Sequence, residues 1–130
     1  MAAVDEIIGM VMHFFGSLVH FVGFILLLQV PVQNQYMESQ HLYLIYLSIA
    51  EGTYCFLMTI FYIGLALEIE KLTIVMFITA GCLIYTWYIS IIILLTIDRV
   101  LNVRFNIQYV VIWTKKKSHI AVMLWFYLAV

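Results

Sequence analysis

The chain has 130 residues, of which 66% are hydrophobic and 10% are charged, and its formal net charge is −1. Soluble domains are about 45–50% apolar and about 25% charged, and disordered chains are richer still in charge, so this composition excludes both classes. It indicates an integral membrane protein built from apolar helices.

The first apolar run covers residues 7–30 and carries no Asp, Glu, Lys or Arg. A membrane-spanning helix needs about 20 apolar residues, so this run is long enough to cross a bilayer. Its flank, Asp5-Glu6, is acidic, whereas a signal peptide has a basic flank and a shorter apolar run. A spanning helix is therefore favoured and a signal peptide is the lesser alternative. His13 and His20 are seven residues apart and share one face of this helix, where we expect them to face a neighbouring helix.

The second run covers residues 42–67 and contains a single charged residue, Glu51. A carboxylate at the centre of a spanning helix costs roughly 2.5–3.5 kcal/mol on the insertion scale, so Glu51 should face the inside of the bundle. Helical spacing places further polar or small side chains on roughly the same face: Ser48, Cys55, Thr59 and Tyr62. Two interpretations of Glu51 and Ser48 remain open. They form either a structural hydrogen-bonding contact between helices or a site for an ion, a proton or a conformational switch.

The third run covers about residues 72–98 and ends at Asp98-Arg99. Four small or polar residues lie on one side of it and predict a helix interface: Thr79, Cys82, Thr86 and Ser90. The last run, residues 118–130, would rise only about 20 Å as a helix, less than the bilayer core of about 30 Å. We therefore expect a fourth span that is truncated in this sequence, as in a shortened product or a partial gene model.

The cations are concentrated between the third and fourth runs. Five of the six Lys and Arg residues lie there: Arg99, Arg104, Lys115, Lys116 and Lys117. The positive-inside rule places this loop in the cytoplasm, so we expect a multi-pass protein with an extracellular N-terminus. The same cations orient the chain in the bilayer, and no nucleic-acid partner is expected. We find no nucleophile–His set, zinc spacing or phosphate-binding loop, so no enzymatic activity, metal or cofactor is predicted.

Three markers resemble the rhodopsin-like (class A) G protein-coupled receptors. Leu47-Ser-Ile-Ala-Glu51 is similar to the Leu-x-x-x-Asp of the second helix in that family, and Asp98-Arg99-Val100 is similar to the Asp-Arg-Tyr that ends the third. Trp125 stands 26 residues after Arg99, where the family carries a Trp in its fourth helix. The resemblance implies an all-α transmembrane bundle in which residues 1–130 supply the first three and a half of seven helices.

That resemblance also implies a function. A plasma-membrane receptor of this family passes a signal from an extracellular ligand, here unknown, to a heterotrimeric G protein. By the resemblance, Asp98, Arg99 and Val100 form the switch and Ile107 contacts the G protein, while Trp125 marks helix packing. Possible ligand-facing residues are Gly81, Cys82 and Tyr85.

Several positions depart from the family pattern. Gly23-Phe24 stands in place of a Gly-Asn pair, and Ile74 occupies the usual position of a disulfide cysteine. Glu51 and Tyr88 replace the Asp and Ser of the family's sodium pocket, so sodium binding is not expected to carry over. Gly81 stands where amine receptors carry an Asp, which disfavours a biogenic amine as ligand.

Two alternatives to a receptor remain. One is a small multi-span membrane protein, such as a transporter or channel subunit, in which Glu51 is the working carboxylate. The other is a truncated product that does not signal by itself.

Overall fold

The computed structural model describes residues 2–31, 35–105 and 113–129. All regular secondary structure in these residues is helical, which confirms the all-α prediction. The elements are α1 (Ala2–Gln29), α2 (Gln35–Ala66), α3 (Glu70–Ile78), the π-helix η1 (Thr79–Ile84), α4 (Tyr85–Phe105) and α6 (Lys115–Ala129).

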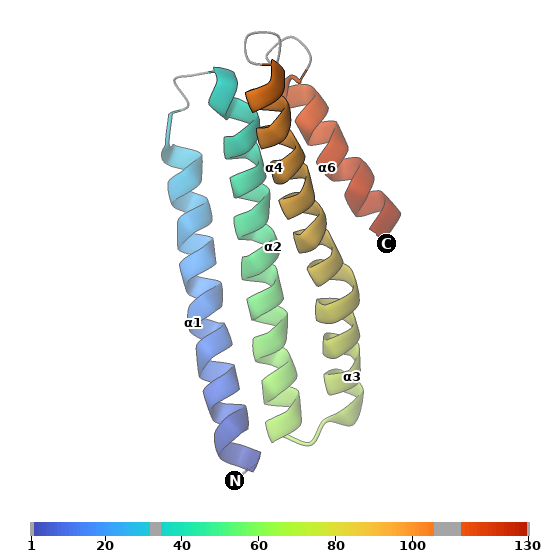
Figure 1. Cartoon of the computed structure of the whole chain (residues 1–130). Helices are drawn as coiled ribbons and strands as arrows, with labels where there is room; N and C mark the ends of the chain where they lie inside the picture. Colours follow the sequence, from blue (N-terminus) through green and yellow to red (C-terminus); the bar gives the residue numbers. More distant parts are fainter. Residues whose placement is uncertain (1, 32–34, 106–112, 130) are drawn as a thin grey trace.

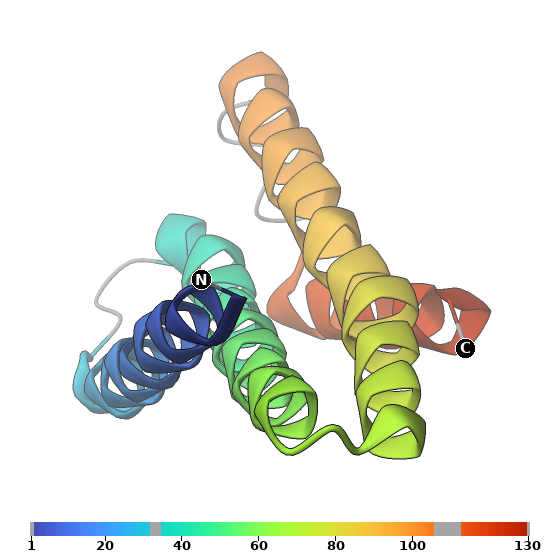
Figure 2. The same ribbon diagram turned by 90° about the horizontal axis from the view of Figure 1, so that it is seen from below.

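Helix α2 is the centre of the arrangement (Figure 1). It runs antiparallel to α1 and contacts every other element: α1, α3, η1, α4 and α6. α3, η1 and α4 follow one another as a single long rod, and α6 leans away from its end (Figures 1 and 2). The N-terminus and the α2–α3 turn lie at one end of the bundle. The end of α4 and the lysine-bearing start of α6 lie at the other.

Three helical segments in the described residues are long and apolar enough to cross a membrane: Val4–Gln29, Glu38–Ala66 and Glu70–Phe105. The predicted runs at residues 7–30, 42–67 and 72–98 overlap them, with boundaries that agree to within four residues except at the end of the third. That helix continues to Phe105, seven residues beyond the predicted end. α6 has 15 residues, fewer than the about 20 that a span requires.

The outer surface of the bundle is apolar. On α1, for example, Met12 is 70% and Val19 is 67% exposed. A soluble protein rarely exposes large contiguous apolar patches, whereas hydrocarbon chains solvate such side chains well. The buried core is small and lies between α2, α4 and α6: Tyr43, Ala50, Ile91, Leu94 and Val122. The surface therefore suits lipid, which agrees with a membrane protein.

Three glycines bring α1 close to α2. They recur every seven residues on one face of α1, and the residues that they meet on α2 recur with the same spacing. A Cβ added at each glycine would lie 2.6 Å from the Tyr62 ring, 3.2 Å from Cys55 Sγ and 3.9 Å from Ser48 Oγ, for Gly9, Gly16 and Gly23 respectively. Small residues at such positions let helix backbones approach closely, which favours dispersion contacts inside a membrane.

The α2–α3 turn ends α2 with a Schellman motif. The Ile69 N–H donates to the Gly64 carbonyl at 2.9 Å, and the Glu68 N–H donates to Leu65 at 3.1 Å. Glu68 has a φ of 56°, the left-handed conformation that this motif requires and that glycine usually provides. The turn reverses the chain within three residues and so places α3 directly beside α2.

Candidate functional site

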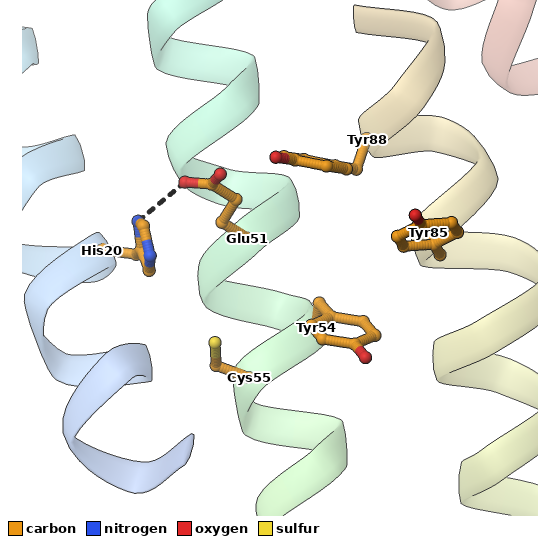
Figure 3. A pocket seen from close by; sticks show the side chains of 6 residues that line it. All are labelled: His20, Glu51, Tyr54, Cys55, Tyr85 and Tyr88. Atoms are coloured by element: carbon orange, nitrogen blue, oxygen red, sulfur yellow. Dashed lines mark ion pairs between the residues drawn. The ribbon is translucent and has the colours of Figure 1, made fainter. Parts of the chain in front are cut away.

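A polar contact inside the bundle joins His20 of α1 to Glu51 of α2 (Figure 3). His20 Nδ1 lies 3.0 Å from Glu51 Oε2, and the two side chains are 33% and 28% exposed. Both residues lie within the segments that can span a membrane. A carboxylate in hydrocarbon needs a partner, and the imidazole supplies one. The glycine contacts on either side of the pair hold the two helices close enough for it to form.

The pair borders a partly open cavity of about 280 Å³ between α1, α2 and the start of α4. The lining residues are His20, Glu51, Tyr54, Cys55, Tyr85 and Tyr88 (Figure 3). The Tyr54 and Tyr85 ring centroids are 6.4 Å apart, and those of Tyr85 and Tyr88 are 6.1 Å apart. The Tyr88 hydroxyl points toward the Glu51 carboxylate. The cavity therefore combines one acid with three aromatic rings.

The structure separates the residues that helical spacing had grouped with Glu51. Cys55 lines the same cavity, whereas Ser48 faces Gly23 on α1. The Thr59 hydroxyl donates to the Cys55 carbonyl of its own helix at 2.9 Å. The polar side of α2 thus faces α1, and only part of it belongs to the cavity.

Both histidines of α1 face α2, as the sequence predicts. His13 stacks on Tyr62 with ring centroids 5.5 Å apart, and His20 pairs with Glu51. The sequence did not single out His20 as the partner of Glu51, nor Tyr54 and Tyr88 as lining residues. The matching seven-residue spacings on α1 and α2 are a signal that could have identified the His20–Glu51 pair.

The expected interface on the third helix is only partly present. Ser90 is buried, whereas Cys82 and Thr86 are exposed. The hydroxyls of Thr79, Thr86 and Ser90 each donate to the carbonyl four residues back in their own helix. The hydroxyl protons of these three side chains are therefore used in hydrogen bonds within their own helix and do not link it to another helix.

Asp98 and Arg99 point in different directions at the end of α4. The Asp98 side chain is fully buried, and it interacts electrostatically with Tyr43 of α2, which lies close to Ser118 of α6. Arg99 is exposed and, with Val100, Val103 and Arg104, lines a shallow groove on the outer face of α4. Successive residues of an α-helix are about 100° apart, so one can face inward and the next outward.

The remaining predicted residues are dispersed. Tyr85 lines the cavity, whereas Gly81 and Cys82 are exposed within η1, outside it. A Cβ added at Gly81 would meet no atom within 4 Å. Trp125 is 43% exposed on α6 and lies outside the buried core. Ile107 lies outside the described residues.

The described residues contain no group of three or more His, Cys, Asp or Glu side chains that could hold a metal ion. No family model matches the chain, and neither a curated protein nor a solved structure matches it. The case for a function therefore depends on the site geometry and on the sequence markers.

Proposed function

We propose that the chain forms the first helices of a rhodopsin-like receptor of the plasma membrane, with its N-terminus outside the cell. The receptor passes a signal from an extracellular ligand to a heterotrimeric G protein. The observation that carries the proposal is the separation of Asp98 from Arg99: an acid buried inside the bundle and, next to it, an exposed cation six residues before the end of the third spanning helix.

This geometry suits a two-state switch. Asp98 is buried where α4 packs against its neighbours, within electrostatic range of Tyr43 of α2, so its surroundings depend on the packing of the helices. Arg99 lies on an open groove with a second cation, Arg104, and attracts an acidic or carbonyl-rich partner there. A switch needs one element whose two positions differ in their contacts. α4 would be that element, because a shift of its last turns would change the surroundings of the buried Asp98 and of the exposed Arg99 together.

The charge distribution supports the proposed orientation. Arg99 and Arg104 near the end of α4 and the lysines at the start of α6 lie at the same end of the bundle. Cations gather on the cytoplasmic side of membrane proteins. The proposed G protein site and the positive end of the bundle therefore coincide.

The test uses the complete open reading frame that contains residues 1–130, expressed in cells with sensors of G protein dissociation. Asp98→Asn should raise basal signalling several-fold because it removes the buried charge without changing the size of the side chain. Arg99→Gln should abolish signalling. Glu70→Gln, which also neutralises an acid but at the opposite end of the bundle, is the control for Asp98→Asn. Arg104→Gln, which neutralises a cation on the same helix, is the control for Arg99→Gln. Equal effects of Arg99→Gln and Arg104→Gln would contradict the assigned role of Arg99.

A second candidate function is favoured by the His20–Glu51 pair at a cavity: a small multi-span transporter or channel subunit with Glu51 as its working carboxylate. Glu51→Gln distinguishes the two proposals. A transporter loses ion flux in proteoliposomes, whereas a receptor changes its basal G protein signalling. Sequencing the transcript past Val130 adds an independent test, because the receptor requires further spanning helices.

A further inference from the structure

We infer that the cavity between α1, α2 and α4 is a binding site for a small organic cation of the substituted-ammonium class. Glu51 would be its counter-ion, and the rings of Tyr54, Tyr85 and Tyr88 would surround its alkyl groups. The cavity does not include Gly81, the position at which the absence of an acid disfavours a biogenic-amine ligand, and it is formed by residues of this chain alone.

The residues that line the cavity determine which sign of charge the ligand must carry. Among the described residues, the cavity is lined by one carboxylate, Glu51, by the imidazole of His20 and by no Lys or Arg. With a neutral imidazole that donates its Nδ1–H to Glu51, the lining carries a net negative charge, so an anion would be repelled. A neutral apolar ligand would not require Glu51, whose presence at this depth is costly. The faces of aromatic rings carry partial negative charge and attract ammonium groups, an interaction that strengthens away from water. An acid together with three tyrosines therefore favours a cation with an apolar surface.

The cavity volume favours an organic over an inorganic cation. About 280 Å³ is far more than a bare metal ion occupies, and it lies just below the roughly 300 Å³ at which typical ligand pockets begin. The described residues also lack a set of metal ligands. A compact ammonium ion with a few carbon atoms fits both observations.

His20 positions the acid. Its Nδ1 lies 3.0 Å from the carboxylate oxygen Oε2, and this contact holds the Glu51 side chain at the border of the cavity. A carboxylate can interact with two partners at once through its two oxygens. The imidazole and the ligand would then share Glu51, with Tyr88 facing the same group from α4.

The experiment measures binding to the full chain in lipid nanodiscs by isothermal titration calorimetry. The probes are choline chloride, its neutral isostere 3,3-dimethylbutan-1-ol, and sodium chloride. We expect saturable choline binding and none of the neutral alcohol. Glu51→Gln should weaken choline binding about tenfold to a hundredfold, as expected for a hydrogen-bonded charge. Glu38→Gln, near the start of the same helix and outside the cavity, is the matched control and should bind choline like the unmodified chain.

The tyrosines provide a second, independent test. Tyr85→Leu should weaken choline binding about twofold to thirtyfold because it removes a ring, whereas Tyr85→Phe keeps the ring and should retain most of the affinity. Circular dichroism would establish that each variant is helical. Equal binding of choline and the neutral alcohol, unchanged affinity in Glu51→Gln, or full competition by equimolar sodium would each overturn the inference. None of these results alters the G protein test of Asp98 and Arg99.

Discussion

Replacing Gly16 with cysteine tests the packing of α1 against α2, on which the cavity depends. A Cβ at Gly16 would lie 3.8 Å from Cys55 Cβ and 3.2 Å from its Sγ. Disulfides have Cβ–Cβ distances of about 3.5–4.5 Å with a mean near 3.8 Å. In a Cys82→Ser background, Gly16→Cys should therefore form a disulfide with Cys55 on mild oxidation.

The bond should stabilise the fold measurably. It closes a loop of roughly 40 residues, for which the chain-entropy relation gives about 4 kcal/mol at 25 °C. This value is an upper limit, because helices that stay inserted in the membrane are already restricted when they separate. We expect a gain of about 1–3 kcal/mol in the free energy of unfolding, measured by titration with SDS in bicelles.

The assay is protection of the thiols from maleimide–polyethylene glycol, detected as the loss of a gel shift and its return after reduction. Gly23→Cys in the same background is the control. Its neighbour is Ser48, and a displacement of seven residues along a helix is about 10.5 Å, beyond disulfide reach. Closure by Gly23→Cys and not by Gly16→Cys would mean that α1 is shifted by two turns, and the reasoning would be refuted.

Three other substitutions, together with Tyr46→Phe as the reference for Tyr43→Phe, test the fold by thermal unfolding in detergent. Gly64→Val should destabilise the fold by about 1–3 kcal/mol, because an added Cβ lies 2.8 Å from Thr73 Oγ1 and 3.4 Å from its backbone N. Glu68→Gly should stabilise it by about 0.5–1 kcal/mol by relieving the left-handed backbone at φ 56°. The hydroxyl of the buried Tyr43 lies near Ser118 and Trp113 but makes no hydrogen bond of good geometry among the described residues, so Tyr43→Phe should change the stability by less than about 1 kcal/mol. Tyr46→Phe should instead cost about 0.5–1.5 kcal/mol.

Each of these substitutions is compared with a control variant whose expected change in stability differs. Tyr46 Oη lies 2.6 Å from His119 Nδ1, so the two tyrosine variants compare a bonded hydroxyl with an unbonded one. Gly81→Ala meets open space, and it should gain up to about 1 kcal/mol from helix propensity while Gly64→Val loses stability. Glu70→Gly, in the first turn of α3, should cost stability where Glu68→Gly gains it. If Glu68→Gly and Glu70→Gly change stability in the same direction, the backbone at Glu68 does not store the strain assigned to it.

The sequence alone predicts most of the helical architecture. Apolar runs that exceed the thickness of a bilayer must form helices, because every backbone polar group needs a hydrogen bond in hydrocarbon. The positions of the three long helices follow from this requirement, but the end of the third does not, because α4 continues past Asp98-Arg99 to Phe105. The need of Glu51 for an internal partner follows from the cost of an isolated carboxylate.

The tertiary structure decided which side chains meet. His20 and Glu51 are 31 residues apart in the sequence and pair because the glycines of α1 set the register of two antiparallel helices. Spacing within one helix could group Ser48 with Glu51, but it could not determine that Ser48 faces Gly23 and that Tyr54, Tyr85 and Tyr88 complete the cavity. The sequence also predicted that the third membrane helix ends at Asp98-Arg99, whereas α4 continues to Phe105. Only the packing of α4 against its neighbours buried the acid and left the cation exposed. The physical reason is that a helix fixes its own length and faces, whereas contacts between helices depend on their crossing and register.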